Sequence, residues 1–305
     1  MLSILIPIYN YNAVALVRCL HAQAVKLAIN FEILLLDDAS DNTQSREENA
    51  VLKELSHTVL YELPTKAGRS IARNFLAGHA QYDYLLFLDC DSEPLDEEFI
   101  KRYIPYCNGD SVVVCGGTAY KQMLPPRNSY LRWVYGTRAE TTSAQERNKR
   151  PNSRFSTFNF LIAKKLFWSI RFNELLKNYG HEDTLFGLEL RKRNCVIQHI
   201  DNPLYHTGID TNDVYLKKTK QGVQNLKILL ENYPDHDLLI NDIRLLRVYT
   251  KIEKLKLTPV FYVVYLVFKK IIVLNLNSKF PSLFLFNLYK LNYLCYLKYN
   301  DSHDL

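Results

Sequence analysis

The sequence predicts an α/β protein with a mostly parallel central sheet flanked by helices, followed by a helical C-terminal extension. Short, almost wholly apolar runs alternate with helical stretches through the first 120 residues. Runs of this kind are typical of strands that helices bury on both faces. With 305 residues, 48% of them hydrophobic and 23% charged, the chain is long enough for one large domain and an appendage.

The expected elements are placed by their apolar patterns and by the turn residues between them. Strands are expected at 2–8, 31–36, 59–63, 84–88, 112–115, 158–163 and 196–200. Helices are expected at 13–28 after a cap at Asn12, and at 44–55, 68–80, 97–106, 130–144, 165–170 and 182–193. Parallel strands bring their carboxyl ends to one edge of the sheet, where such folds bind ligands.

Polar residues stand at three of these strand ends. The first strand closes with Pro7–Asn10, the second with Asp37–Asp38 and the fourth with Asp89–Asp91. Acids in a solvated loop need no explanation, whereas acids beside a pocket can hold a cation. A further acidic pair, Glu182–Asp183, opens a helix, where the helix dipole alone would favour carboxylates. The three strand ends predict a ligand site at one edge of the sheet.

Composition argues against several kinds of site and partner. The six cysteines form no Cys-x-x-Cys pair, so we expect reduced thiols rather than a thiolate zinc site or disulfides. The first residues lack a basic leader and a long apolar stretch, so they indicate a strand rather than a secretory signal. Residues 244–299 carry ten Lys or Arg and one acid, which leaves −3 for the rest of a chain of net charge +6. No nucleic-acid recognition motif accompanies this charge, so no nucleic-acid partner is expected.

Six short motifs occur in one order along residues 1–210. They are Ile6–Asn10, Glu32–Ser40, Gly68–Asn74, Asp89–Asp91, Gly180–Asp183 and His206. This set resembles glycosyltransferase family 2, which comprises inverting enzymes with the A-type nucleotide-sugar fold. The resemblance implies a single nucleotide-sugar-binding catalytic domain, which we place at residues 1–243, and leaves a basic, aromatic-rich helical tail at 244–305.

The resemblance implies a role in donor binding for five positions. Pro7 and Tyr9 would line the nucleobase and the ribose. Asp38 would accept a hydrogen bond from the base ring, Arg73 would flank the nucleotide, and Asp89 would face the ribose. From the residues alone, Arg73 could equally be a charge on a helix surface.

The resemblance also implies a cation site and a catalytic base. Asp91 would reach a divalent cation, Mn²⁺ or Mg²⁺, with Asp89 completing the Asp-x-Asp motif and His206 as a further candidate ligand. Asp183 matches the general base of the family, and Glu182 beside it would contact the sugar or the acceptor. His206 could instead be an ordinary histidine with its hydrogen bonds satisfied in the fold.

The implied reaction is a metal-dependent, inverting transfer of a hexosyl or N-acetylhexosaminyl group in polysaccharide biosynthesis at the cell envelope. The donor would be a nucleoside-diphosphate sugar, uridine-linked by preference, and the acceptor a hydroxyl of a glycan or of a lipid-linked acceptor. A hard cation offsets the charge of the leaving diphosphate, and a carboxylate takes the proton of the acceptor hydroxyl. No Gln-x-x-Arg-Trp motif occurs, so a processive synthase is not expected, and Ala39 stands where the family has glycine.

Two other functions fit part of the sequence. In an aspartyl-nucleophile phosphatase, Asp89 would attack phosphorus and Asp91 would act as the acid, although that pair usually follows the first strand. A non-catalytic subunit could retain the fold and organise a membrane glycan assembly. The intact carboxylates Asp89, Asp91 and Asp183 argue against this second alternative.

The basic tail predicts a membrane partner. The apolar run Pro259–Phe268 is interrupted by Lys269–Lys270, so it is too short to span a bilayer. In Ser282–Tyr299 the polar residues Asn287, Lys290 and Lys298 share one stripe of a helix that is otherwise mostly apolar, which suits the lipid headgroup boundary. The alternative is a pair of helices packed on the domain or a dimer interface. We therefore expect a cytoplasmic protein, peripheral on the inner face of the cell membrane.

Overall fold

The structure is a computed structural model that describes residues 1–174, 176 and 179–300. The chain divides into two compact units. The sheet unit comprises residues 1–121, 140–177 and 182–208, and the helical unit comprises 122–139, 178–181 and 209–305. The helical unit therefore includes residues 209–243 and two earlier segments as well as the tail expected from residue 244.

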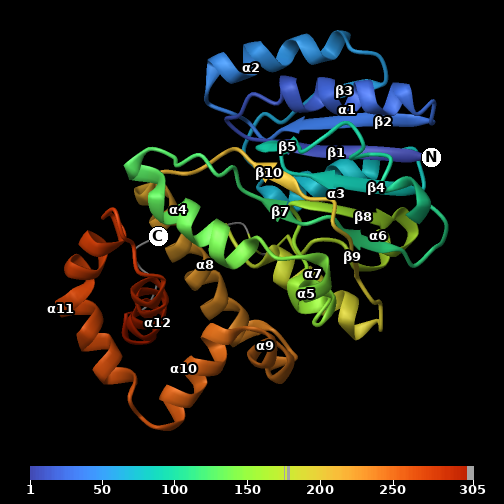
Figure 1. Ribbon diagram of the computed structural model, residues 1–305. Helices are drawn as coiled ribbons and strands as arrows, with labels where there is room; N and C mark the ends of the chain where they lie inside the picture. The colour runs from blue at the N-terminus through green and yellow to red at the C-terminus, as the bar shows by residue number, and fades with distance from the viewer. Residues whose placement is uncertain (175, 177–178, 301–305) are drawn as a thin grey trace. The chain divides into compact units, whose positions relative to one another are not determined.

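The sheet unit is built on a seven-stranded sheet in the order β3-β2-β1-β4-β8-β6-β9 (Figure 1). Its strands are β1 (Leu2–Ile8), β2 (Phe31–Asp37), β3 (Thr58–Glu62), β4 (Tyr84–Leu88), β6 (Val113–Cys115), β8 (Asn159–Ala163) and β9 (Gln198–His199). All neighbouring pairs are parallel except those that β8 makes with β4 and β6. The predicted α/β fold with a mainly parallel sheet is confirmed.

A three-stranded sheet and several helices complete this unit. The small sheet has the order β5-β10-β7, with β5 (Ser92–Pro94), β10 (Leu204–His206) and β7 (Thr118–Ala119). The α-helices are α1 (Val14–Lys26), α2 (Thr43–Ala50), α3 (Arg69–His79), α5 (Ala144–Asn148), α6 (Lys164–Ile170) and α7 (Glu182–Lys192). Single 3-10 turns are η1 (Val51–Glu54), η2 (Ile104–Tyr106) and η5 (Asn152–Arg154). The cap expected at Asn12 is wrong, because Ala13 is the N-cap of α1, although Oδ1 of Asn12 accepts from the N–H of Val14 at 2.9 Å.

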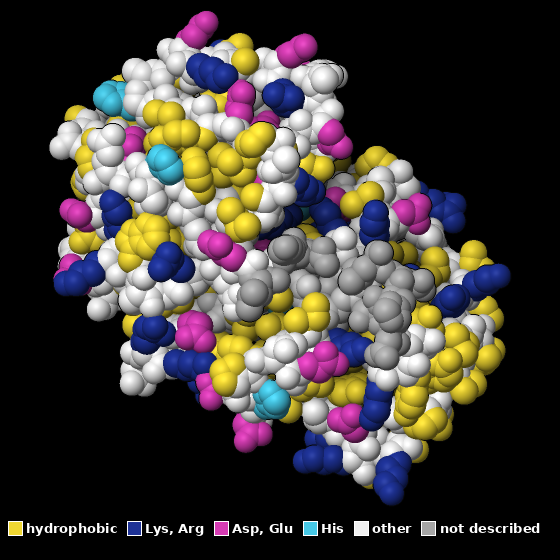
Figure 2. All heavy atoms as spheres, turned by 180° about the vertical axis from the view of Figure 1, so that it is seen from behind, with side chains coloured by type: hydrophobic (Ala, Val, Ile, Leu, Met, Phe, Trp, Pro, Cys, Tyr) yellow, Lys and Arg dark blue, Asp and Glu magenta, His cyan; other side chains and the backbone are white. Residues whose placement is uncertain are grey.

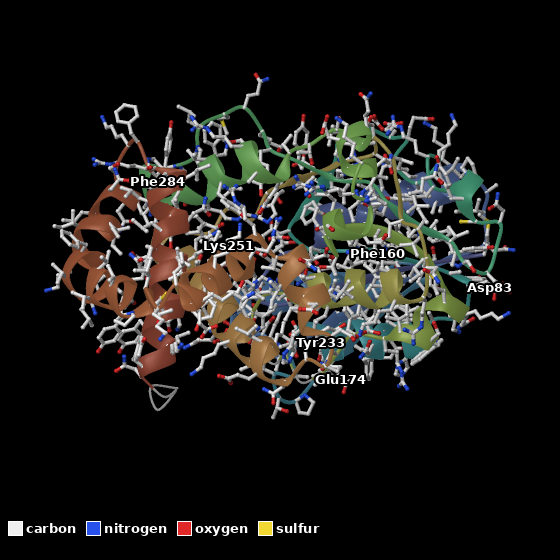
Figure 3. All side chains as sticks on the ribbon, turned by 90° about the horizontal axis from the view of Figure 1, so that it is seen from below. Asp83, Phe160, Glu174, Tyr233, Lys251 and Phe284 are labelled. Atoms are coloured by element: carbon white, nitrogen blue, oxygen red, sulfur yellow. The ribbon has the colours of Figure 1, made fainter. Side chains whose placement is uncertain are left out.

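Both faces of the large sheet are buried, because successive side chains of a strand point to opposite sides. Ile4 and Ile6 of β1 belong to the apolar layer that contains Leu20 of α1. Leu5, between them, belongs to the other layer, with Leu76 of α3 and with Phe160, which is labelled in Figure 3. This double burial is the physical reason for the continuous apolar runs in the sequence.

The helix expected at 97–106 is wrong except for its last 3-10 turn. Residues 97–103 form a series of turns. Side chains from elsewhere bind the backbone groups that a helix would use: Gln23 accepts from the N–H of Ile100 at 3.0 Å, and Asn202 donates to the carbonyl of Phe99 at 3.0 Å. Tertiary hydrogen bonds therefore override the local helical pattern.

The helical unit consists of one helix from the middle of the chain and of the successive helices that follow residue 209. They are α4 (Tyr130–Tyr135), α8 (Asn212–Asn232), α9 (His236–Asp242), α10 (Arg244–Lys254), α11 (Thr258–Leu276) and α12 (Leu283–Tyr299), with the 3-10 turn η3 (Arg127–Ser129) before α4. The helix expected at 130–144 is shorter than predicted, because α4 passes into one π-helical turn, η4 (Gly136–Glu140). The sequence pattern did not reveal α8.

Helix α12 is a packed helix, so the prediction that it lies at the lipid headgroup boundary is wrong. Eight of its side chains are buried: Phe286, Tyr289, Leu291, Asn292, Tyr293, Leu294, Cys295 and Leu297. The rings of Tyr289 and Tyr293 lie 6.1 and 5.5 Å from the ring of Tyr265 in α11. An apolar helix has the same sequence pattern whether lipid or protein covers it, and only the packing distinguishes the two.

Candidate active site

The carboxyl end of β1 lies where β1 and β4 separate. Pairing between β1 and β2 continues to Ile8, whereas pairing between β1 and β4 ends at Leu5 opposite Phe87. Pro7 has no N–H to give to a neighbouring strand, so it suits a position where two strands have separated. Doubly wound sheets bind ligands at such points. Beyond the strand end, Tyr9 is 38% exposed, and the Nζ of Lys66 lies over its ring, 3.4 Å from the ring centroid.

The two acids at the end of β2 are buried and hold two loops in place. Asp37 accepts from the N–H of Ser40 at 2.6 Å. Asp38 accepts from the N–H groups of Ala67 and Gly68 at 2.6 and 2.9 Å, one on each carboxylate oxygen. Asp38 thus fixes the loop that leads into α3, a role that the motif did not predict. Each carboxylate oxygen has a second lone pair, so Asp38 can still accept from a ligand.

Two residues at these strand ends have left-handed backbone conformations. Asn10 has φ of 52° and Ala39 has φ of 55°. This region disfavours alanine and favours glycine, which explains why the related motif has glycine at the position of Ala39. Backbone strain of this kind is concentrated at functional sites.

Arg73 links the end of β4 to the start of α7. Its side chain is 1% exposed, and one guanidinium nitrogen lies 2.8 Å from Oδ1 of Asp89. The other terminal nitrogen lies 3.5 Å from Oε1 of Glu182, and Arg69 lies 3.8 Å from the same oxygen. The alternative that Arg73 is a charge on a helix surface is therefore wrong. Arg73 is buried and contacts both acidic motifs, so it brings them into one site.

Asp91 and His206 lie next to one another at one end of the small sheet, where His206 of β10 pairs with Ser92 of β5. Oδ2 of Asp91 lies 3.5 Å from Nε2 of His206. The imidazole is held between two rings, with centroids 5.6 Å from that of Tyr120 and 5.3 Å from that of Phe158, both nearly parallel. Thr207 donates its N–H and its hydroxyl to the carbonyl of Asp91, each at 2.8 Å. His206 and Asp91 are thus fixed side by side.

This pair fits part of a divalent cation site. Carboxylate oxygen and imidazole nitrogen are donors that Mn²⁺ accepts, and carboxylate oxygen also suits Mg²⁺. Within residues 1–174, 176 and 179–300, no group of three or more His, Cys, Asp or Glu side chains could hold a metal. An ion here would take its other ligands from water and from the phosphates of a substrate, as Mg²⁺ commonly does. Asp89, the other expected ligand, is engaged by Arg73.

Asp183 stands in the first turn of α7, after His181, whose φ is 71°. Its Oδ1 accepts from the N–H of Thr184 at 2.6 Å. Burial, and then the charge of Glu182, raise the pKa of Asp183 from 3.8 to about 6. Because a general base works best with a pKa near the operating pH, this environment suits a carboxylate that accepts a proton.

The sequence reasoning missed the residues that position the predicted ones. Tyr120 and Phe158 hold His206, and Thr207 holds the loop of Asp91. Tyr11, two residues after Tyr9, bonds through its hydroxyl to that of Thr207 at 2.9 Å. Of these residues, only Thr207 could have been found from the sequence, because it directly follows His206. The two ring residues are separated from His206 by long stretches of chain.

Comparison with known proteins identifies the family. A family model described as Glycosyl transferase family 2 matches residues 3–171. The chain belongs to this family. The protein is therefore a glycosyltransferase, as the six motifs predicted, and the phosphatase alternative has no support.

Individual proteins also match this chain, at low sequence identity. An uncharacterized glycosyltransferase of Haemophilus influenzae is 24% identical over 243 residues, which cover 73% of this chain and 90% of that protein. A chondroitin synthase of Escherichia coli is 25% identical over 241 residues, or 67% of this chain and 34% of the larger protein. A mannosyltransferase from Pyrobaculum calidifontis, solved with GDP-Man and Mn²⁺, superposes with a TM-score of 0.58 and 12% identity, covering 99% of this chain and 88% of that one. At this identity the likeness shows the fold alone.

Proposed function

We propose that the protein transfers a sugar, with inversion, from a nucleoside-diphosphate sugar to a hydroxyl of a glycan or of a lipid-linked acceptor. One observation carries this proposal: the guanidinium of Arg73 lies between Asp89 and Glu182. It brings the acidic motif after β4 and the acidic pair of α7 into a single site. The reaction needs carboxylates that hold a cation against the leaving diphosphate. It also needs a separate carboxylate that takes the proton of the acceptor hydroxyl.

Asp183 is the proposed general base. The acceptor oxygen attacks the anomeric carbon as the bond from that carbon to the diphosphate oxygen breaks, and the hydroxyl proton passes to Asp183. A single displacement with a single base inverts the anomeric configuration. The raised pKa of Asp183, about 6, lets it remain ionised at neutral pH and still be basic enough to accept the proton. Glu182, held by Arg73 and Arg69, is placed to contact the sugar or the acceptor.

Asp91 and His206 are the proposed protein ligands of a divalent cation, Mn²⁺ or Mg²⁺. A bound cation would supply positive charge to the leaving diphosphate. Asp89 would act on the ribose side, and its bond to Arg73 fixes its orientation. The donor complex of the Pyrobaculum mannosyltransferase, which holds GDP-Man and Mn²⁺, supports a sugar nucleotide and a cation of this class.

Pro7, Tyr9 and Asp38 are the proposed contacts of the nucleoside. Tyr9 is partly exposed beyond the strand end, and Asp38 keeps lone pairs for a donor on the base. Uridine is the first choice of base and guanosine the second. The name of the chondroitin synthase supports a polysaccharide acceptor. We propose non-processive transfer, because the Gln-x-x-Arg-Trp motif is missing.

Calorimetry on an Asp91 variant tests the cation site. Asp91→Ala should abolish Mn²⁺-dependent binding of UDP or GDP with little loss of stability, because Asp91 lies at a strand end and is not part of the apolar core. Asp110→Ala is a matched control, since Asp110 is an exposed acid paired with the exposed Lys165. The cation role of Asp91 would be rejected if both variants bound every nucleotide as tightly as the wild type does.

A further inference from the structure

Helix α11 presents an apolar stripe to solvent. Val260, Val263, Val267, Ile271 and Leu274 are each more than half exposed. Their spacings of three and four residues place them on one face of the helix. Figure 2 shows hydrophobic side chains gathered at the lower right, on the side where α11 lies. A contiguous exposed apolar surface of this kind marks an interaction site.

The opposite face of α11 is fixed to the helical unit. Tyr265, Ile272 and Leu276 are buried, and the hydroxyl of Thr258 bonds to that of Tyr299 at 2.7 Å. In the described part of the chain, α11 is the one helix that could span a membrane by length and composition, and 17% of its apolar stretch is buried. Spanning would require α11 to leave α12 and would carry two lysines into the hydrocarbon.

Positive charge surrounds the stripe. Residues 254–300 contain seven lysines and no acid. Five of these lysines are exposed and lie just before, within or just after α11: Lys254, Lys256, Lys269, Lys270 and Lys279. A second copy of the chain would bring the same lysines against one another, because a two-fold interface pairs identical surfaces. An anionic partner suits this charge.

We propose that the outer face of α11 docks on the surface of an anionic bilayer, with the helix lying in the plane of the headgroups. The apolar stripe enters the boundary of the acyl chains, and the lysines bind lipid phosphates. Phe280 and Phe284, which are 86% and 75% exposed, stand in and just after the loop that joins α11 to α12 (Phe284 is labelled in Figure 3). The surface thus lies mainly on α11, whereas the sequence pattern had assigned the membrane contact to the helix that is now α12.

Vesicle co-sedimentation of the full chain tests this proposal. Vesicles of equal parts phosphatidylglycerol and phosphatidylcholine should pellet the wild type, and the double variant Val267→Glu/Ile271→Glu should bind about tenfold more weakly or worse. The control is Val25→Glu/Val196→Glu, which places the same charges at exposed valines of the sheet unit. Circular dichroism checks that both variants fold. The control should pellet like the wild type, and pure phosphatidylcholine or high salt should weaken binding.

Three results would overturn the proposal. Equal pelleting of the wild type and the Val267→Glu/Ile271→Glu variant would show that the stripe does not touch lipid. A lipid-free dimer that becomes monomeric in this variant would assign the stripe to a second copy. Pelleting that resists high salt and needs detergent to reverse would indicate a spanning helix. None of these measurements depends on sugar transfer, so the docking surface is tested independently of the proposed function.

Discussion

Replacing Asp183 by asparagine should slow sugar transfer and stabilise the fold at the same time. The pKa of Asp183 is raised to about 6, first by burial and then by the charge of Glu182. The ionised form that accepts a proton is therefore held in the folded protein at a cost in stability. Asparagine has the same shape and no charge, and its side-chain oxygen can keep the bond from the N–H of Thr184.

The expected gain in stability follows from the size of the pKa shift of Asp183. A rise of about two pKa units corresponds to at most about 3 kcal/mol, and partial exposure reduces this, so we expect about 1–2 kcal/mol of added stability at pH 8. Because the folded pKa lies above the unfolded value, the protonated carboxyl stabilises the fold below about pH 4. This contribution is lost as the pH rises through about 6. The advantage of the Asp183→Asn variant should therefore disappear in acid.

Turnover and urea unfolding measure the two effects separately. Turnover of Asp183→Asn should fall by about 10²–10⁴ while donor affinity changes by no more than a few-fold. In the wild type, turnover should drop below about pH 6, and the variant should lack this acidic limb. Asp110→Asn, at an exposed acid, should change neither quantity. Turnover near the wild-type value, or a loss of stability at pH 8, would refute the assignment of Asp183.

Two further predictions concern residues around the site. Arg73→Met should cost about 3–5 kcal/mol, because it removes the buried counter-charge of Asp89 and leaves Glu182 beside the more exposed Arg69. The same variant should move the acidic limb of the turnover profile to higher pH, since the charge of Arg73 lowers the pKa of Asp183. Arg73→Lys keeps the positive charge and should leave this limb near its wild-type pH, and an unchanged limb in Arg73→Met would mean that Arg73 acts only through packing. Ala39→Gly should raise the free energy of unfolding by about 0.5–1 kcal/mol, because it relieves left-handed strain at φ of 55° and this outweighs the greater backbone entropy of glycine. Urea unfolding checks this, and a destabilised Ala39→Gly variant would contradict it.

The sequence by itself determined the strands of the sheet and the positions of the acidic residues at the strand ends. The strands β1, β2 and β4 lie within a residue of their expected bounds, because a strand buried on both faces must be apolar throughout. The acids at their ends could be located for the same reason, since each follows directly where an apolar run stops. The order of six short motifs then identified the family.

Tertiary structure alone decided how those residues are connected. The sequence placed Arg73 on a helix and Asp89 at a strand end, but only the fold shows that one guanidinium joins Asp89 to Glu182. The ring pair around His206 comes from two distant segments and has no local signal. The tail shows the same limit: α11 and α12 are both apolar, and neighbouring helices bury α12 while they leave one face of α11 in solvent. Apolar periodicity reports that a face must be covered, and only the fold reveals which faces the protein itself covers.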